Sequence, residues 1–101
     1  MKKAHRHGEK IIGIAWYRKE QWSLLRQVSK NPEKLEATHE ECLNNAIELK
    51  KTFDKTGVSV KEVDIDIENI IKWCEERHRA IDSKSISEYV ALRLRASDKL
   101  N

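Results

Sequence analysis

Apolar residues fill both faces of the stretch IIGIAWY, residues 11–17, when it is read as an extended strand. One face carries three large apolar side chains, Ile12, Ile14 and Trp16. The other face is apolar but shallow, because it includes Gly13 and Ala15. The pattern therefore predicts a strand covered on both faces, with a helix packed closely against the shallow one.

Helical spacing follows this strand directly. A first helix is predicted from an apolar stripe formed by Trp22, Leu25 and Val28, and it ends before Pro32. A second helix begins at Thr38, which has capping-box spacing to Glu41. This helix continues to Gly57, a residue type that commonly ends helices.

The stretch VSVKEVDID, residues 58–66, predicts a second strand. Its apolar residues change faces, with Val58 and Val60 on one side and Val63 and Ile65 on the other. We therefore expect a bulge or bend near residues 61–62.

Two more helices are predicted after the second strand. Asp66 caps the first of them, and its inner stripe consists of Ile67, Ile70, Ile71 and Cys74. The last helix is expected to start with Ser85, which has capping-box spacing to Glu88. The order strand, helix, helix, strand, helix, helix predicts a helix-rich α/β fold.

A helical crossover usually joins parallel strands, so the two short strands are expected to be parallel, with about four helices in the order β-α-α-β-α-α. Two strands alone make a poor sheet. Either the sheet is completed to four strands across a homodimer, or the protein is mainly helical with a short two-stranded ribbon.

The 101 residues suffice for one domain, which we place at residues 11–101 after a flexible basic tail at residues 1–10. Four of the 20 basic residues and one of the 17 acidic residues lie in the tail. The remaining 16 of each sign cancel, so the tail accounts for the net charge of +3. The apolar segment after the tail is too short for a signal peptide or a membrane span, which favours a cytoplasmic protein with reduced cysteines.

A ligand site is predicted at the carboxyl ends of the two strands. Parallel strands end at one edge of a sheet, and ligands of open α/β sheets bind there. The candidate ligand-binding residues are Tyr17, Arg18, Glu20, Asp64 and Asp66. An aromatic ring, a guanidinium and carboxylates suit a small polar molecule or a peptide terminus. The alternative is structural, with Arg18 paired to an acidic neighbour and Asp66 capping a helix.

Two His/Cys pairs supply the ligand types of a zinc site. His39 and Cys42 lie three residues apart, and Cys74 and His78 lie four apart, so that each pair shares a helix face. No CxxC knuckle is present, and both cysteines fall on apolar stripes, where a reduced cysteine acts as a small hydrophobe. Cys74, with His78 one helical turn away, is also a candidate nucleophile with a nearby base.

The chain contains no GxSxG, P-loop or GxGxxG motif, which argues against common hydrolase and nucleotide-binding classes. The leading interpretation is a small cytosolic, homodimeric and non-enzymatic binding or interaction module. One alternative is a nucleic-acid-associated protein that uses the basic residues 1–10. Another is a small zinc-binding protein or enzyme that uses the His/Cys cluster.

The segment GIAWYRKEQW, residues 13–22, resembles a signature of short uncharacterised bacterial proteins, in which Ala-Trp-Tyr precedes Glu-Gln-Trp. The likeness extends through Thr38, the DID strand end and the final SEYVAL helix. This resemblance implies a bacterial cytosolic origin, and it implies no activity or functional residue.

Overall fold

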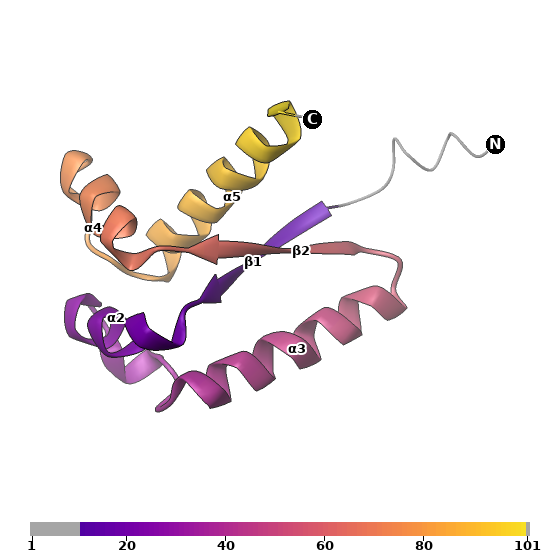
Figure 1. Cartoon of the computed structure of the whole chain (residues 1–101), viewed down its shortest axis with the longest axis horizontal. Coiled ribbons are helices and arrows are strands. Elements are labelled where there is room, and N and C mark those ends of the chain that lie inside the picture. Colours follow the sequence, from indigo (N-terminus) through magenta and orange to yellow (C-terminus); the bar gives the residue numbers. More distant parts are fainter. Residues whose placement is uncertain (1–10, 101) are drawn as a thin grey trace.

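The computed structural model describes residues 11–100, with side chains as far as residue 96. Its elements are β1 (Ile11–Tyr17), the 3₁₀ turn η1 (Lys19–Gln21), α2 (Trp22–Val28), the 3₁₀ turn η2 (Pro32–Lys34), α3 (His39–Lys55), β2 (Ser59–Ile65), α4 (Ile67–Glu76) and α5 (Ser83–Leu100). The fold is therefore a helix-rich α/β domain in the predicted order β-α-α-β-α-α (Figure 1).

The two strands form a parallel sheet in continuous register, from Ile11 opposite Ser59 to Tyr17 opposite Ile65. The bulge expected near residues 61–62 is wrong, because pairing is regular through both residues. The apolar residues of β2 change faces without a change of register because helices cover both faces of the sheet. Helix α3 packs on one face, and α5 packs on the other.

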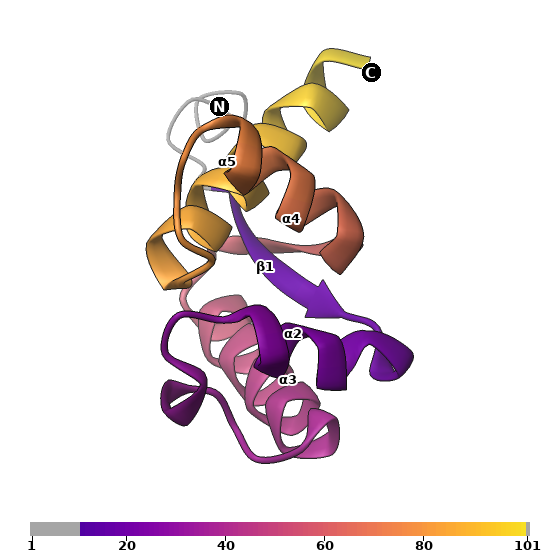
Figure 2. The same ribbon diagram turned by 90° about the vertical axis from the view of Figure 1, so that its left-hand side faces the viewer.

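The helices thus form layers on either side of the sheet. Both views place α3 on one side of the strands and α4 with α5 on the opposite side (Figures 1 and 2). The close approach of α5 explains Gly13, since a Cβ atom there would lie 2.8 Å from Val90 Cγ1 and 3.6 Å from Leu94 Cδ2. The prediction of a helix packed on the shallow face of β1 is confirmed.

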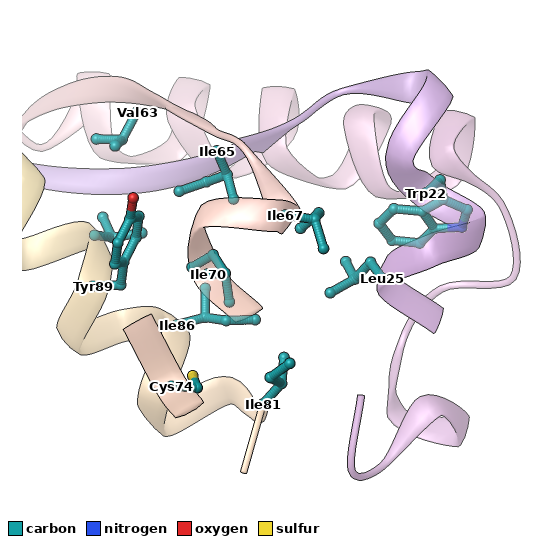
Figure 3. Close-up of a cluster of buried hydrophobic side chains, with 11 residues drawn as sticks. Trp22, Leu25, Val63, Ile65, Ile67, Ile70, Cys74, Ile81, Ile86 and Tyr89 are labelled. Carbon is teal, nitrogen blue, oxygen red and sulfur yellow. The ribbon is translucent and has the colours of Figure 1, made fainter. Parts of the chain in front are cut away.

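The buried core lies on the α4 and α5 side of the sheet and extends to α2 (Figure 3). Its members are Trp22, Leu25, Val63, Ile65, Ile67, Ile70, Cys74, Ile81, Ile86, Tyr89 and Val90. Helix α3 contributes no buried residue. Trp22 is 7% exposed, whereas Trp16 is only half-buried and lies outside this core. Of the two tryptophans in residues 13–22, Trp22 belongs to the core and Trp16 does not.

The predicted ends of α3 and α4 are present. Thr38 caps α3 by accepting a hydrogen bond from the Glu41 backbone N–H at 3.1 Å. Asp66 caps α4 by accepting from the Glu68 N–H at 3.1 Å. Gly57 follows α3 with φ of 85°, a left-handed conformation that glycine adopts without steric cost.

Helix α5 begins earlier than predicted, at Ser83 rather than at Ser85. Asp82 is the capping residue, because its carboxylate accepts from the Ser85 N–H at 2.9 Å. Ser85 itself is buried and donates to the Ala80 carbonyl, while Glu88 pairs with Arg79. Within residues 11–100, no helix combines the length and the apolar character needed to cross a membrane.

Candidate functional site

Three of the five predicted ligand-binding residues meet at the carboxyl ends of the strands. Arg18 follows β1, and its Nε and Nη2 atoms donate to the two carboxylate oxygens of Asp64 at 3.2 and 2.7 Å. Arg18 Nη1 also lies 3.8 Å from Asp66 Oδ2. The regular register brings these residues together, because Tyr17 and Ile65 end their strands side by side.

Gln21 completes this group, although the sequence analysis did not identify it. Its Nε2 atom donates to Asp66 Oδ1 at 2.9 Å, and its Oε1 atom accepts from the Ile67 backbone N–H at 2.8 Å. We call Arg18, Gln21, Asp64 and Asp66 the strand-end cluster. Gln21 lies between charged residues and the core residue Trp22, and no motif or periodicity marks it. The cluster joins η1 to the start of α4.

The electrostatics of the strand-end cluster keep its carboxylates ionised. The hydrogen bond from Arg18 holds the pKa of Asp64 below its usual range. Hydrogen bonds from Gln21 and the Glu68 N–H, with the charge of Arg18, lower the pKa of Asp66. Arg18, Asp64 and Asp66 are already paired with groups of the same chain. The cluster therefore connects the end of β1 and η1 to the start of α4. This arrangement agrees with the structural alternative, in which Arg18 pairs with an acidic neighbour and Asp66 caps a helix.

The other two candidates are placed differently. Glu20 is exposed in η1, where its charge contributes to raising the pKa of Arg18 after the larger effect of Asp64. Tyr17 packs edge-on against Trp22, with ring centroids 5.7 Å apart. Burial, together with Cys42 and Glu36, raises the pKa of Tyr17 far above its usual range. Tyr17 is therefore half-buried rather than solvent-facing and remains a neutral phenol.

The four residues proposed for zinc do not form one site. His39 and Cys42 belong to α3, whereas Cys74 lies in α4, on the other side of the sheet (Figure 1). His39 Nε2 donates to the Tyr17 carbonyl at 2.8 Å, and His78 is exposed with φ of 54°. In the part of the chain that the structure describes, no group of three or more His, Cys, Asp or Glu residues could hold a metal ion.

The cysteines are also poorly suited to nucleophilic attack. Burial, followed by the effects of Glu36, raises the pKa of Cys42 to about 11. Cys74 is 1% exposed, and burial raises its pKa. Both thiols stay protonated at neutral pH, and the thiolate is the reactive form.

A pocket of about 220 Å³ lies near the end of β1, and Tyr17 is the one of the five predicted ligand-binding residues that lines it. The loop after α2 and the start of α5 form its walls, and Tyr17 contributes to its lining. The Lys30 N–H donates to the Ile81 carbonyl at 2.9 Å and so joins the two walls. Sequence patterns could not reveal this pocket, because the whole of α3, β2 and α4 separates its two walls along the chain.

The basic residues 1–10 lie outside the described residues, so the nucleic-acid hypothesis stays a prediction. Comparison with protein-family models, curated proteins and solved structures finds no match for this chain.

The strand-end cluster gives a first testable prediction. Replacing Gln21 by alanine should lower the free energy of unfolding by about 1–2 kcal/mol, because two hydrogen bonds are lost and the backbone N–H of the buried residue Ile67 loses its acceptor. Asp64→Asn should change stability far less, because Asp64 is exposed and surface ion pairs contribute little. Urea denaturation of both variants measures the difference. Equal losses in the two variants would contradict the assigned role of Gln21.

Proposed function

We propose that this chain is a small, non-enzymatic interaction module of the bacterial cytoplasm that acts as a homodimer. The proposed origin and compartment rest on the sequence resemblance and on the short apolar segment that follows residues 1–10. The protonated state of Cys42 and Cys74 and the internal pairing of Asp64 and Asp66 support a binding role over a catalytic one.

The observation that carries the proposal is the open edge of β1. All seven residues of this strand are apolar or glycine, and none is buried, although helices pack on both faces of the sheet. In the described residues the sheet has two strands, so one edge of β1 has no strand neighbour. Ile11, at its start, is 41% exposed. An uncharged, apolar edge is a template for pairing with another strand.

Strand β2 has the opposite character. It carries Lys61, Glu62 and Asp64, all of them exposed. Glu62 forms an ion pair with Lys50 of α3 at 3.0 Å. Charged side chains protect edge strands from pairing with other chains. The distribution of charge therefore favours β1 as the interface and leaves β2 at the outside.

A second copy of this chain suits the β1 edge. Antiparallel pairing of β1 with itself around a two-fold axis near Ile14 brings no like charges together, because β1 has no charged residue. Ile12 of one protomer then lies opposite Trp16 of its partner, and the small Gly13 lies opposite Ala15. The product is a four-stranded sheet with the strand order β2-β1-β1-β2, which is within the usual size of sheets in globular proteins.

A charge placed at this edge tests the proposal. Ile11→Lys should raise the dissociation constant of the dimer at least about tenfold. Each dimer interface would then bury two lysine ammonium groups, one from each protomer, in place of two isoleucine side chains. Sedimentation velocity over a range of micromolar concentrations measures the monomer and dimer fractions.

Leu92→Lys is the matched control, because Leu92 is similarly exposed, at 45%, but lies on α5. This variant should dimerise as the unmodified chain does. Circular dichroism checks that both variants are folded. An unmodified chain that sediments only as a monomer throughout the micromolar range would overturn the proposal, as would equal dissociation constants for the two lysine variants.

A further inference from the structure

The pocket beside Tyr17 has an apolar interior. Leu35, Ile81 and Ile86 line it together with Tyr17, and Ile81 and Ile86 are at least nine-tenths buried as members of the core. A volume of about 220 Å³ is below the range of roughly 300–1,000 Å³ that is usual for drug-sized ligands. The pocket therefore suits a small molecule with a compact apolar group.

Polar side chains without partners surround this interior. Among residues 11–96, the side chains of Asn31, Lys34, Ser83 and Ser87 have no hydrogen-bond or ion-pair partner, and all four line the pocket. The Tyr17 hydroxyl likewise has no partner in the described chain. Asn31 and Tyr17 are half-buried, whereas Lys34, Ser83 and Ser87 are exposed. Because none of these polar groups is engaged by another group of the described chain, they are available to a polar ligand group beside the apolar interior.

The pocket lining carries one positive and one negative side chain. Lys34 supplies an ammonium group from the loop after α2. Asp82 supplies a carboxylate, and the Ser85 N–H occupies its Oδ1 atom. Hydrogen bonding from Ser85 and the charges of Lys30 and Lys84 lower the pKa of Asp82, so it remains ionised at neutral pH. Opposite charges in one small pocket match a ligand that carries both an ammonium and a carboxylate.

We propose that this pocket binds a free α-amino acid with an aliphatic side chain. The aliphatic group contacts Leu35, Ile81 and Ile86. The ligand carboxylate pairs with Lys34, and its ammonium group pairs with Asp82. The serine hydroxyls and the Asn31 amide provide further hydrogen bonds. The site shares one residue, Tyr17, with the strand of the proposed dimer interface, and the residues assigned to the ligand charges, Lys34 and Asp82, lie outside β1.

Four probes separate the parts of this proposal. L-leucine carries the aliphatic group and both charges, 4-methylpentanoate lacks the ammonium group, 3-methylbutan-1-amine lacks the carboxylate, and glycine lacks the side chain. Titration of the ¹⁵N-labelled full chain should show L-leucine binding at least about tenfold more tightly than each other probe. The shifted amide signals should include Asn31, Ser83 and Ser87.

Substitutions test which groups hold the ligand. Lys34→Ala should weaken L-leucine binding at least about tenfold. Lys51→Ala is the control, because Lys51 is an exposed lysine of α3 outside the pocket. Asp82→Asn keeps an oxygen that can cap α5 while removing the charge, and it should make the affinities for L-leucine and 4-methylpentanoate equal.

Two results would overturn the proposal. One is the absence of shifts in the pocket amides with about 10 mM L-leucine, a concentration that detects even millimolar dissociation constants. The other is binding of either singly charged probe as tightly as L-leucine. Because the measurement follows individual amides, it distinguishes failure of the pocket from failure of dimer formation.

Discussion

Replacing Trp22 by alanine is expected to lower the free energy of unfolding by about 3–5 kcal/mol, the range for truncating a buried tryptophan. Trp22 belongs to the core and contacts the rings of Tyr17 and His39 edge-on, with centroid distances of 5.7 and 6.0 Å. Trp16→Ala should lower the free energy of unfolding by only about 1–2 kcal/mol, because the half-buried side chain of Trp16 buries less apolar area on folding than that of Trp22. Urea denaturation followed by circular dichroism measures both losses.

A third variant refines this comparison. The Trp22 indole N–H is buried without a hydrogen-bond partner in the described residues. Trp22→Phe removes that polar group and keeps an aromatic ring, so it should be clearly more stable than Trp22→Ala. Similar losses for alanine at positions 16 and 22 would contradict the assignment of Trp22 alone to the core. Measurement at several protein concentrations separates folding from any contribution of dimerisation.

Gly13→Ala is expected to destabilise the chain by about 1–3 kcal/mol, although alanine is ordinarily acceptable in a strand. The added Cβ would lie 2.8 Å from Val90 Cγ1 and 3.1 Å from Val63 Cγ2. Both valines are buried and β-branched, so their side chains have little freedom to move away. Helix α5 would have to shift away from the sheet.

A double-mutant cycle isolates this contact. Val90→Ala removes the methyl group that a Cβ at position 13 would meet. The double variant should therefore be more stable than the sum of the two single losses predicts, by about 0.5–3 kcal/mol. Gly57→Ala serves as the control, since nothing lies within 4 Å of its added Cβ and its cost comes from φ of 85°. Its loss should add to that of Val90→Ala. Additivity in the Gly13 cycle would refute the close contact.

Local patterns predicted most of the elements because caps and apolar spacing act over a few residues. The strand at residues 11–17 and the caps at Thr38 and Asp66 are confirmed. The start of α5 was misplaced because Asp82 and Ser85 are both good capping residues three positions apart. The choice between them depends on burial of Ser85 against Ala80, which is a tertiary contact.

The change of face in β2 shows that the apolar pattern of a strand does not specify which elements cover it. An apolar residue in the sequence signals that something covers it, but not which element does so. Val60 and Val63 lie on opposite faces of one regular strand, because separate helices cover the two faces of the sheet. The sequence pattern of such a strand is indistinguishable from that of a bulged strand covered on one face.

The candidate site was predictable where it depends on sheet topology alone. Parallel strands placed Arg18 beside Asp64 and Asp66, as expected. The orientation of Tyr17 was not predictable, because the packing of its ring depends on Trp22 and on residues of α3. The pocket was also beyond sequence patterns, since chain folding alone brings residues 29–35 next to residues 81–87.

The absence of buried residues in α3 has a consequence for the motions of this chain. Helix α4 is anchored by Ile67, Ile70 and Cys74, whereas the 17 residues of α3 have no comparable anchor. The free energy needed to open a segment locally follows the apolar area that the segment buries. We therefore expect α3 to separate from the sheet and close again many times for each global unfolding of the chain. Such openings would expose the half-buried Cys42 and Trp16 while the core around Leu25 stays intact.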